Sequence, residues 1–279
     1  MALKMTVKKH IGLLTLHGKA GQIAPAFMSS FASNLVLTTD FDTDLLGSFT
    51  GEPPRLKTPQ ECAIEKASLA ADLTSLDAGI GSEGSFGPGP YGLGIMNREL
   101  IAYVDTALGF KVLGQFNGPI LVKGLEVNAH QHKQLEEAEL LLSQVPAGQG
   151  LVLQLADNLS VQQKGLSVDE VRSMLPHWLA QGTVKLSYDL RAHQCPARQV
   201  HIIKAAQNLV ERLKCECPKC STPGFWPEHY ETGLPCELCN TPTEKIKHRI
   251  AKCQHCLHTD IYPEAEAFAQ PDYCPRCNP

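Results

Sequence analysis

Over the first 214 residues, short apolar runs alternate with longer segments whose apolar residues recur every three or four positions. Short apolar runs are typical of buried strands, and the longer periodic segments are typical of amphipathic helices. The expected strands are 11–16, 35–39, 78–82, 100–104, 111–116, 121–127, 151–155 and 184–190, and the expected helices are 20–33, 59–76, 130–144, 168–181 and 197–213. This alternation predicts an α/β fold in which a mixed sheet is flanked by helices.

Several helix ends carry local signals. Thr58 with Glu61, and Ser167 with Glu170, have the spacing of capping boxes. Pro176 should kink or shorten the helix that contains it. The last helix follows Pro196, and its spacing predicts four buried residues: Val200, Ile203, Val210 and Leu213.

The last 63 residues contain four Cys-x-x-Cys pairs. The pairs are Cys217/Cys220, Cys236/Cys239, Cys253/Cys256 and Cys274/Cys277. Two thiolates three positions apart can bind one ion from a tight knuckle, and a hairpin brings a second pair to complete a tetrahedral site. Four thiolates leave no position for water, so we expect two structural zinc ions rather than catalytic ones. A redox dithiol or an iron–sulfur site is the rival interpretation.

The pairing of these knuckles stays open. The simplest assignment is tandem, with the first two pairs holding one zinc and the last two pairs holding the other, as a tandem zinc-ribbon module. A cross-braced arrangement, which joins pairs one and three and pairs two and four, uses the same eight ligands. The preceding helix runs into Cys215 without a flexible linker. We therefore expect an α/β domain over 1–214 with a zinc-binding region of two four-cysteine ribbons, 215–279, close beside it.

Charge and apolar runs restrict the partners. The formal net charge is −4, and from residue 211 onward eight Lys or Arg residues stand against ten Asp or Glu residues. A surface that binds a phosphate backbone usually has the opposite sign, so nucleic acid is disfavoured and a protein partner for the ribbons is favoured. No apolar run approaches membrane-spanning length, and no signal peptide is recognised. Cysteines in metal-type pairs favour a reducing, cytoplasmic compartment. The oligomeric state stays open.

Polar residues follow three of the expected strands, where open α/β sheets bind ligands. Lys19 opens a helix beside free backbone N–H groups, an arrangement that suits a phosphate, although a plain turn is the simpler explanation. The acidic segment 40–44 includes Asp42 and Asp44, which either bind Mg²⁺ or form an acidic cap of a helix.

The third cluster begins the Gly/Pro-rich segment 84–94, which we expect to be a shaped loop. Glu83, Gly84 and Ser85 at a strand exit suit a metal or phosphate site. Glu65 on the preceding helix is expected near Glu83, with Lys66 as a further candidate.

Two arginines follow the last expected strand. Arg191 and Arg198 could clamp a phosphate between them. A surface pair between Arg191 and Asp189 is the simpler alternative.

Several segments resemble an uncharacterised bacterial family, a domain of unknown function with a C-terminal zinc-ribbon region. They are LHGKAGQIAP, DTDLLGSFTGE, SEGSFGPGP, DLRA with PAR, and the tail with CPKC, GLPCELC and DYCPRCNP. Residues 11–116 also resemble, in the order of their elements, the inosine/xanthosine triphosphate pyrophosphatase fold. That resemblance implies a phosphate role for Lys19 and Mg²⁺ binding by Glu65 and Glu83. The Thr-x-Asn of that family is replaced here by Leu16-His17-Gly18.

Together these features predict an Mg²⁺-dependent phosphohydrolase acting on a nucleotide or another phosphorylated small molecule. The catalytic or metal-binding candidates are Glu83, Glu65, Asp42 and Asp44, and the phosphate-binding candidates are Lys19, Arg191, Arg198, Gly84 and Ser85. The alternative function is a non-enzymatic adaptor that docks a protein or RNA partner through the ribbons.

Overall fold

The computed structural model describes residues 6–15, 18–41 and 57–279, and its largest element is a five-stranded mixed sheet in the order β2-β1-β3-β4-β5. Its strands are β1 (His10–Leu14), β2 (Asn34–Thr38), β3 (Ala78–Pro88), β4 (Ile95–Asp105) and β5 (Phe110–Ile120). β1 pairs in parallel with both β2 and β3, whereas β3, β4 and β5 form an antiparallel meander. The predicted α/β class with a mixed sheet is confirmed.

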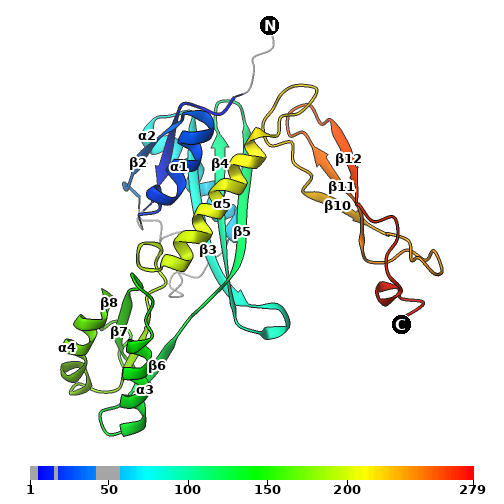
Figure 1. The fold of residues 1–279 in the computed structure, drawn as a ribbon. Helices are drawn as coiled ribbons and strands as arrows, with labels where there is room; N and C mark the ends of the chain where they lie inside the picture. Colours follow the sequence, from blue (N-terminus) through cyan, green and yellow to red (C-terminus); the bar gives the residue numbers. More distant parts are fainter. Residues whose placement is uncertain (1–5, 16–17, 42–56) are drawn as a thin grey trace.

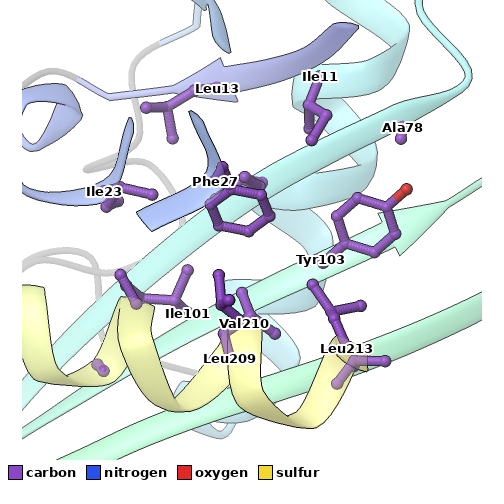
Figure 2. Packing of buried hydrophobic residues seen from close by; sticks show 14 of the residues in the cluster. Ile11, Leu13, Ile23, Phe27, Ala78, Ile101, Tyr103, Leu209, Val210 and Leu213 are labelled. Atoms are coloured by element: carbon purple, nitrogen blue, oxygen red, sulfur yellow. The ribbon is translucent and has the colours of Figure 1, made fainter. Parts of the chain in front are cut away.

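Helices cover both faces of this sheet (Figure 1). α1 (Ala20–Phe31) and α5 (Pro196–Lys214) lie on one face, and α2 (Pro59–Thr74) lies on the other. Figure 2 shows the core on the α1/α5 face, where Phe27 and Tyr103 are the largest fully buried side chains. Leu209 and Leu213 of α5 complete this layer.

α2 packs unusually close to the sheet. Its buried face carries alanines, and glycines stand opposite them on the strands. A Cβ atom at Gly79 would overlap the carbonyl oxygen of Ala67, and one at Gly81 would overlap the carbonyl oxygen of Ala63. The small residues therefore set the distance between α2 and β3.

Gly79→Ala should reduce the free energy of unfolding by about 1–3 kcal/mol, because the helix backbone must move to admit one methyl group. Gly21→Ala is the matched control, since no atom lies within 4 Å of a Cβ at that position. In α1 this change should be neutral or stabilise by about 0.5–1 kcal/mol. Urea unfolding followed by circular dichroism measures both effects, and equal stabilities for the two variants would contradict the close packing.

Residues between β5 and α5 form a second sheet, in the order β6-β9-β7-β8. Its elements are β6 (Gly124–Val127), α3 (His132–Ser143), β7 (Leu151–Leu155), β8 (Gln162–Leu166), α4 (Val168–Leu179) and β9 (Val184–Tyr188). The sheet is antiparallel throughout and has a separate core in which Leu153 and Leu186 are fully buried. This unit was not distinguished from the large sheet in the predicted α/β domain, and β8 was not predicted, because its sequence QQKGL has almost no apolar residue.

The two predicted capping boxes at helix N-termini are confirmed. Thr58 with Glu61, and Ser167 with Glu170, form complete capping boxes. The helix that contains Pro176 ends at Leu179, two residues before the predicted end.

The expected buried stripe of α5 is partly wrong. Val200 and Ile203 are 48% and 39% exposed, while Val210 and Leu213 are buried as predicted. Arg198 and His201 occupy the buried face instead, at helical spacing from the buried Ala205. A rule that assigns apolar residues to the interior misplaces this helix, because its inner face begins with charged and polar groups.

The expected loop at 84–94 is also partly wrong. β3 continues through Gly84 to Pro88, and every residue of that strand faces a partner on β4. Only Pro90–Gly92 (η2) and its neighbours form the turn. Pairing with a neighbouring strand stabilises extended glycines, and that partner is not visible in the local sequence.

The cysteine-rich region contains a three-stranded antiparallel sheet, β10 (His229–Thr232), β11 (Ile246–Lys252) and β12 (Thr259–Pro263). It extends from the end of α5, away from the second sheet (Figure 1). Two short 3₁₀ turns complete the fold, Ala192–Gln194 (η3) and Pro271–Tyr273 (η4). In the described part of the chain, no helix combines the length and apolarity needed to cross a membrane.

Candidate functional site

We use the word crevice for the region at the carboxyl end of β1, beside the far half of β3. The chain leaves β1 to form α1 on one face and leaves β2 to form α2 on the other face, before returning as β3 beside β1. β1 ends at Leu14, whereas β3 continues to Pro88, so the far half of β3 extends beyond its parallel neighbour. Ligands of open α/β sheets bind at such switch points, outside the carboxyl ends of the strands.

Buried charged residues lie at this crevice. Lys19 precedes the first turn of α1, Glu83 lies on β3, Glu99 lies on β4, and Lys66 and Arg198 come from α2 and α5. Each of the five is at most 8% exposed. Buried charges are rare unless they are paired or bind a ligand, so this cluster is the strongest candidate site in the large sheet.

The two carboxylates face opposite sides of the sheet. Glu99 stands opposite Gly84 in the β3–β4 register, and alternate residues of a strand point to opposite faces, so Glu83 points away from Glu99. On the α2 side, Lys66 Nζ lies 2.6 Å from Oε2 of Glu83.

Glu99 is the centre of the α5 side. Its Oε1 accepts hydrogen bonds from Arg198 Nε at 2.6 Å and from Asn97 Nδ2 at 3.0 Å. Lys19 Nζ lies 3.7 Å from Oε2, an oxygen that has no hydrogen-bond partner among the described residues. A Cβ atom at Gly84 would overlap Nη2 of Arg198, so only glycine leaves room for the arginine there.

His201 extends this network. Its Nδ1 lies 2.8 Å from Oδ1 of Asn97, whose amide nitrogen donates to Glu99. The oxygen of Asn97 therefore accepts, and His201 donates through Nδ1. Burial lowers the pKa of His201, which favours the neutral ring. The ring lies 5.1 Å from that of Phe116, so His201 positions Asn97 and, through it, Glu99.

Burial changes the pKa of Lys19. Removal from water lowers its pKa to about 8, with the Glu99 carboxylate acting in the opposite direction and Arg198 adding to the lowering. Lys19, Lys66 and Arg198 are three buried cations, and Glu83 and Glu99 are the two described carboxylates that face them. Among the described residues, the cluster thus has one more positive charge than negative charge.

The structure brings four of the predicted site residues together: Lys19, Glu83, Gly84 and Arg198. Ser85 lies beside them, and its carbonyl oxygen accepts from Asn97 Nδ2 at 3.3 Å.

Four other predicted residues do not join this contact network or fall outside the description. Glu65 forms an ion pair with Lys57 at 2.7 Å on the more exposed side of α2, and Arg191 pairs with the buried Asp189 at 2.6 Å. Asp42 and Asp44 lie outside the described residues.

Asn97, Glu99 and His201 belong to this network but were not predicted as site residues. The available signal for Glu99 was its place directly before the apolar run of β4, because a carboxylate inside a sheet needs a partner. His201 was hidden because the helix was assigned a different inner face.

The cysteine-rich region forms two four-thiol clusters. The first contains Cys217, Cys220, Cys253 and Cys256, and the second contains Cys236, Cys239, Cys274 and Cys277. Five of the sulfur–sulfur distances are 3.5–3.9 Å, and all the sulfur atoms of a cluster lie within 4.8 Å of one another. A tetrahedron with Zn–S bonds of about 2.3 Å has edges of about 3.8 Å, so both clusters fit a zinc ion.

The knuckles share one backbone geometry. In three of them the residue after the second cysteine, Ser221, Asn240 or Leu257, adopts a left-handed conformation. The N–H of that residue donates to the carbonyl of the first cysteine, at 2.8, 2.9 and 3.2 Å respectively. The hydroxyls of Thr222 and Thr241 lower the pKa values of Cys220 and Cys239 to about 6, which favours the thiolate form that binds metal.

The clusters correct the tandem assignment of ligands. Knuckles one and three share a cluster, and so do knuckles two and four. β11 follows the second knuckle in the sequence and leads directly into the third. The first site therefore takes its ligands from knuckles that lie before and after the second knuckle. The expected pair of four-cysteine sites is confirmed, and their connectivity is cross-braced.

Comparison with known proteins identifies the family. A family described as a domain of unknown function, DUF6671, matches residues 66–279. The chain belongs to this family. This confirms the resemblance to an uncharacterised family with a cysteine-rich C-terminal region. Neither the curated proteins nor the solved structures contain a match to the chain, and the resemblance to the pyrophosphatase fold has no support from these comparisons.

Proposed function

We propose that the crevice between β1 and β3 binds a phosphorylated small molecule and that the chain hydrolyses it with the help of Mg²⁺. The observation that carries this proposal is the burial of two cations, Lys19 and Arg198, on one face of the sheet at the switch point, where both contact Glu99. Cations removed from water at a helix N-terminus are suited to hold an anionic ligand.

The phosphate side of the proposal rests on α1 and α5. α1 begins directly after Lys19, and no described side chain caps its first turn. A helix N-terminus with a lysine beside it provides both N–H donors and positive charge for a phosphate. Arg198, in the first turn of α5, adds a guanidinium that can bind phosphate oxygens in a bidentate manner.

The hydrolytic side rests on Glu83. It is a buried carboxylate on the α2 side of β3, paired with Lys66, and its charge still acts on Lys19 of the phosphate side. Carboxylate oxygens are ligands that Mg²⁺ prefers. A metal ion shared with phosphate oxygens would neutralise developing charge and activate water. Water then adds to phosphorus, the bond to the leaving oxygen breaks, and phosphate or pyrophosphate is released.

Glu83→Gln should abolish release of phosphate or pyrophosphate from a panel of nucleotides and sugar phosphates. Magnesium is omitted from the control reaction rather than chelated, because a chelator would also remove zinc from the thiol clusters. Glu136→Gln, at an exposed carboxylate of α3, is the matched control and should retain activity. Turnover that survives in Glu83→Gln, or needs no Mg²⁺, contradicts the assignment.

Affinity for a divalent anion should decline above about pH 8, by about tenfold per pH unit. The anion favours protonated Lys19, and the free protein loses that proton as the pH rises through its lowered pKa. Glu99, Arg198, Glu83 and Lys66 are the charged groups around it. Calorimetric titration with sulfate, whose charge is constant over this range, measures the effect. An affinity that is unchanged between pH 7 and pH 10 would exclude Lys19 from the site.

A non-enzymatic docking role is the second candidate, and one feature of the ribbon sheet favours it. Tyr230 on β10 and Tyr262 on β12 both stand opposite Arg249 of β11 and are 59% and 44% exposed. Exposed aromatic and arginine side chains are enriched in protein interfaces. Changing both tyrosines to serine should remove a bound protein partner without changing phosphate release.

A further inference from the structure

A cavity of about 310 Å³ lies where the cysteine-rich region meets the large sheet. β5 and the end of α5 form one side, and the segments around the first and third knuckles form the other. The lining residues used below are Lys111, Arg212, Trp226, Glu228, His229 and Lys252. Ligand sites are often found between structural units, and this volume lies at the lower end of their usual range.

Direct contacts hold the walls of the cavity in place. Gln254 donates from Nε2 to the carbonyl of Lys111 at 2.6 Å and accepts the N–H of Lys111 at 3.3 Å, in the manner of an added strand residue. Gly224 approaches β5 so closely that a Cβ atom would lie 2.5 Å from Cγ2 of Val112. The cavity is therefore a built feature of the junction.

Arg212 lines this cavity and is its most buried cation. Its side chain is only 11% exposed, and its Nε has no hydrogen-bond partner among the described residues. Arg212 forms a long ion pair, 3.4 Å from Nη1 to Oε2 of Glu228, and the Glu228 side chain is 52% exposed. The guanidinium carbon lies 5.4 Å from the centre of the Trp226 ring. A buried guanidinium with an unused donor is costly, and an anion that accepts from it would remove that cost.

The remaining charges have the same sign. Lys111 and Lys252 line the cavity and are exposed, His229 lies beside them, and Glu228 is the single acidic residue of the lining. Three permanent cations thus face one carboxylate, in a region whose overall charge is negative. This local reversal of sign indicates a small anion rather than a long polyanion.

We propose that this cavity binds a phosphate-bearing small molecule, with Arg212 as the principal ligand and Lys111 and Lys252 at its mouth. The site does not rest on the function proposed for the crevice. Arg198 and Arg212 are 14 residues apart on α5, which places the two sites about 21 Å apart along the helix.

Trp226 reports on this site. The chain has two tryptophans, and Trp178 belongs to the core of the second sheet. In a Trp178→Phe background, with zinc retained, pyrophosphate and ADP are titrated while the fluorescence of Trp226 is recorded. We expect a saturable change, and Arg212→Met should weaken the affinity at least tenfold. Arg249→Met, at an arginine of the ribbon sheet that pairs with Glu264, is the matched control and should bind as the parent does.

Two further measurements keep the test decisive if a variant misfolds. Calorimetry on the unmodified chain and on Lys252→Gln replaces fluorescence if Trp178→Phe is unstable, and Lys252→Gln should weaken binding of pyrophosphate about threefold or more. Lys19→Met removes a cation of the crevice only, so it should leave the signal of Trp226 unchanged. The proposal is overturned if neither probe gives a saturable signal, or if Arg212→Met and Lys252→Gln both bind as tightly as the parent.

Discussion

Replacing Cys217 and Cys253 together by serine should leave one zinc ion per chain, whereas replacing Cys217 and Cys236 together should leave none. The first pair of changes removes two ligands from one cluster, and the second pair removes one ligand from each. Tandem ribbons would give the opposite result for both double variants. Zinc binding of this kind supplies about 10 kcal/mol or more of folding energy per site, so the difference in stability should be large.

The measurement is zinc content per chain by elemental analysis, with absorption of the cobalt-substituted protein as a second reading. Cys215→Ser is the matched control. Cys215 lies two residues before the first ligand but belongs to neither cluster, so this variant should keep both ions. One remaining ion in the Cys217/Cys236 variant would restore the tandem assignment.

Cross-bracing has a mechanical consequence for the cysteine-rich region. Because the first cluster uses ligands from both sides of the second knuckle, neither cluster is built from one continuous stretch of the chain. A parallel bridge between Cys236 and Ala269 adds a further contact between distant parts of the chain. Loss of either metal should therefore loosen the whole region, including the contact of Gln254 with β5.

Features that depend on neighbouring residues were predictable from the sequence, whereas features that depend on distant residues were not. The capping boxes at Thr58 and Ser167 and the cysteine knuckles were predictable, because each depends on residues only a few positions apart. The partner of each knuckle was not predictable, because two pairings satisfy the same spacing. The extension of β3 through its glycines likewise depends on β4, whose contribution no local pattern reveals.

The candidate site shows the same division. Lys19, Glu83 and Arg198 were selected because polar residues followed expected strands or opened a helix, and the structure places them at one crevice. Glu65 and Lys66 were both expected near Glu83, and of the two it is Lys66 that reaches Glu83. Neighbouring residues of a helix point about 100° apart. The face of α2 is only weakly apolar, so its sequence pattern does not show which of the two side chains points toward the sheet.

Arg198→Met should reduce the free energy of unfolding by about 3–5 kcal/mol, the cost of leaving a buried charge without its principal partner. Glu99 is fully buried, and Arg198 makes its shortest contact, at 2.6 Å. Lys19 lies 3.7 Å from the other oxygen, too far for a strong hydrogen bond, and its own pKa is lowered by burial. The remaining contact therefore compensates only part of the loss.

Removing both charges separates the ion pair from general packing. The double variant Arg198→Met/Glu99→Gln should recover most of the lost stability, because neither member then leaves an uncompensated charge in the interior. Lys57→Met is the matched control: its ion pair with Glu65 has nearly the same distance, 2.7 Å, but the two side chains are 52% and 32% exposed. That change should have little effect on the free energy of unfolding, because water screens an exposed pair. Urea unfolding with zinc retained measures all three variants.

The same double variant tests why the charges are present. A methionine and an uncharged amide could fill this space without the cost of burying ions, so a requirement for stability does not explain the pair. If the double variant is stable but no longer binds sulfate, the cluster is retained for its ligand, as the proposed function requires. If it is stable and binds sulfate with unchanged affinity, Arg198 and Glu99 are structural residues, and the phosphate site would have to be sought elsewhere on the chain.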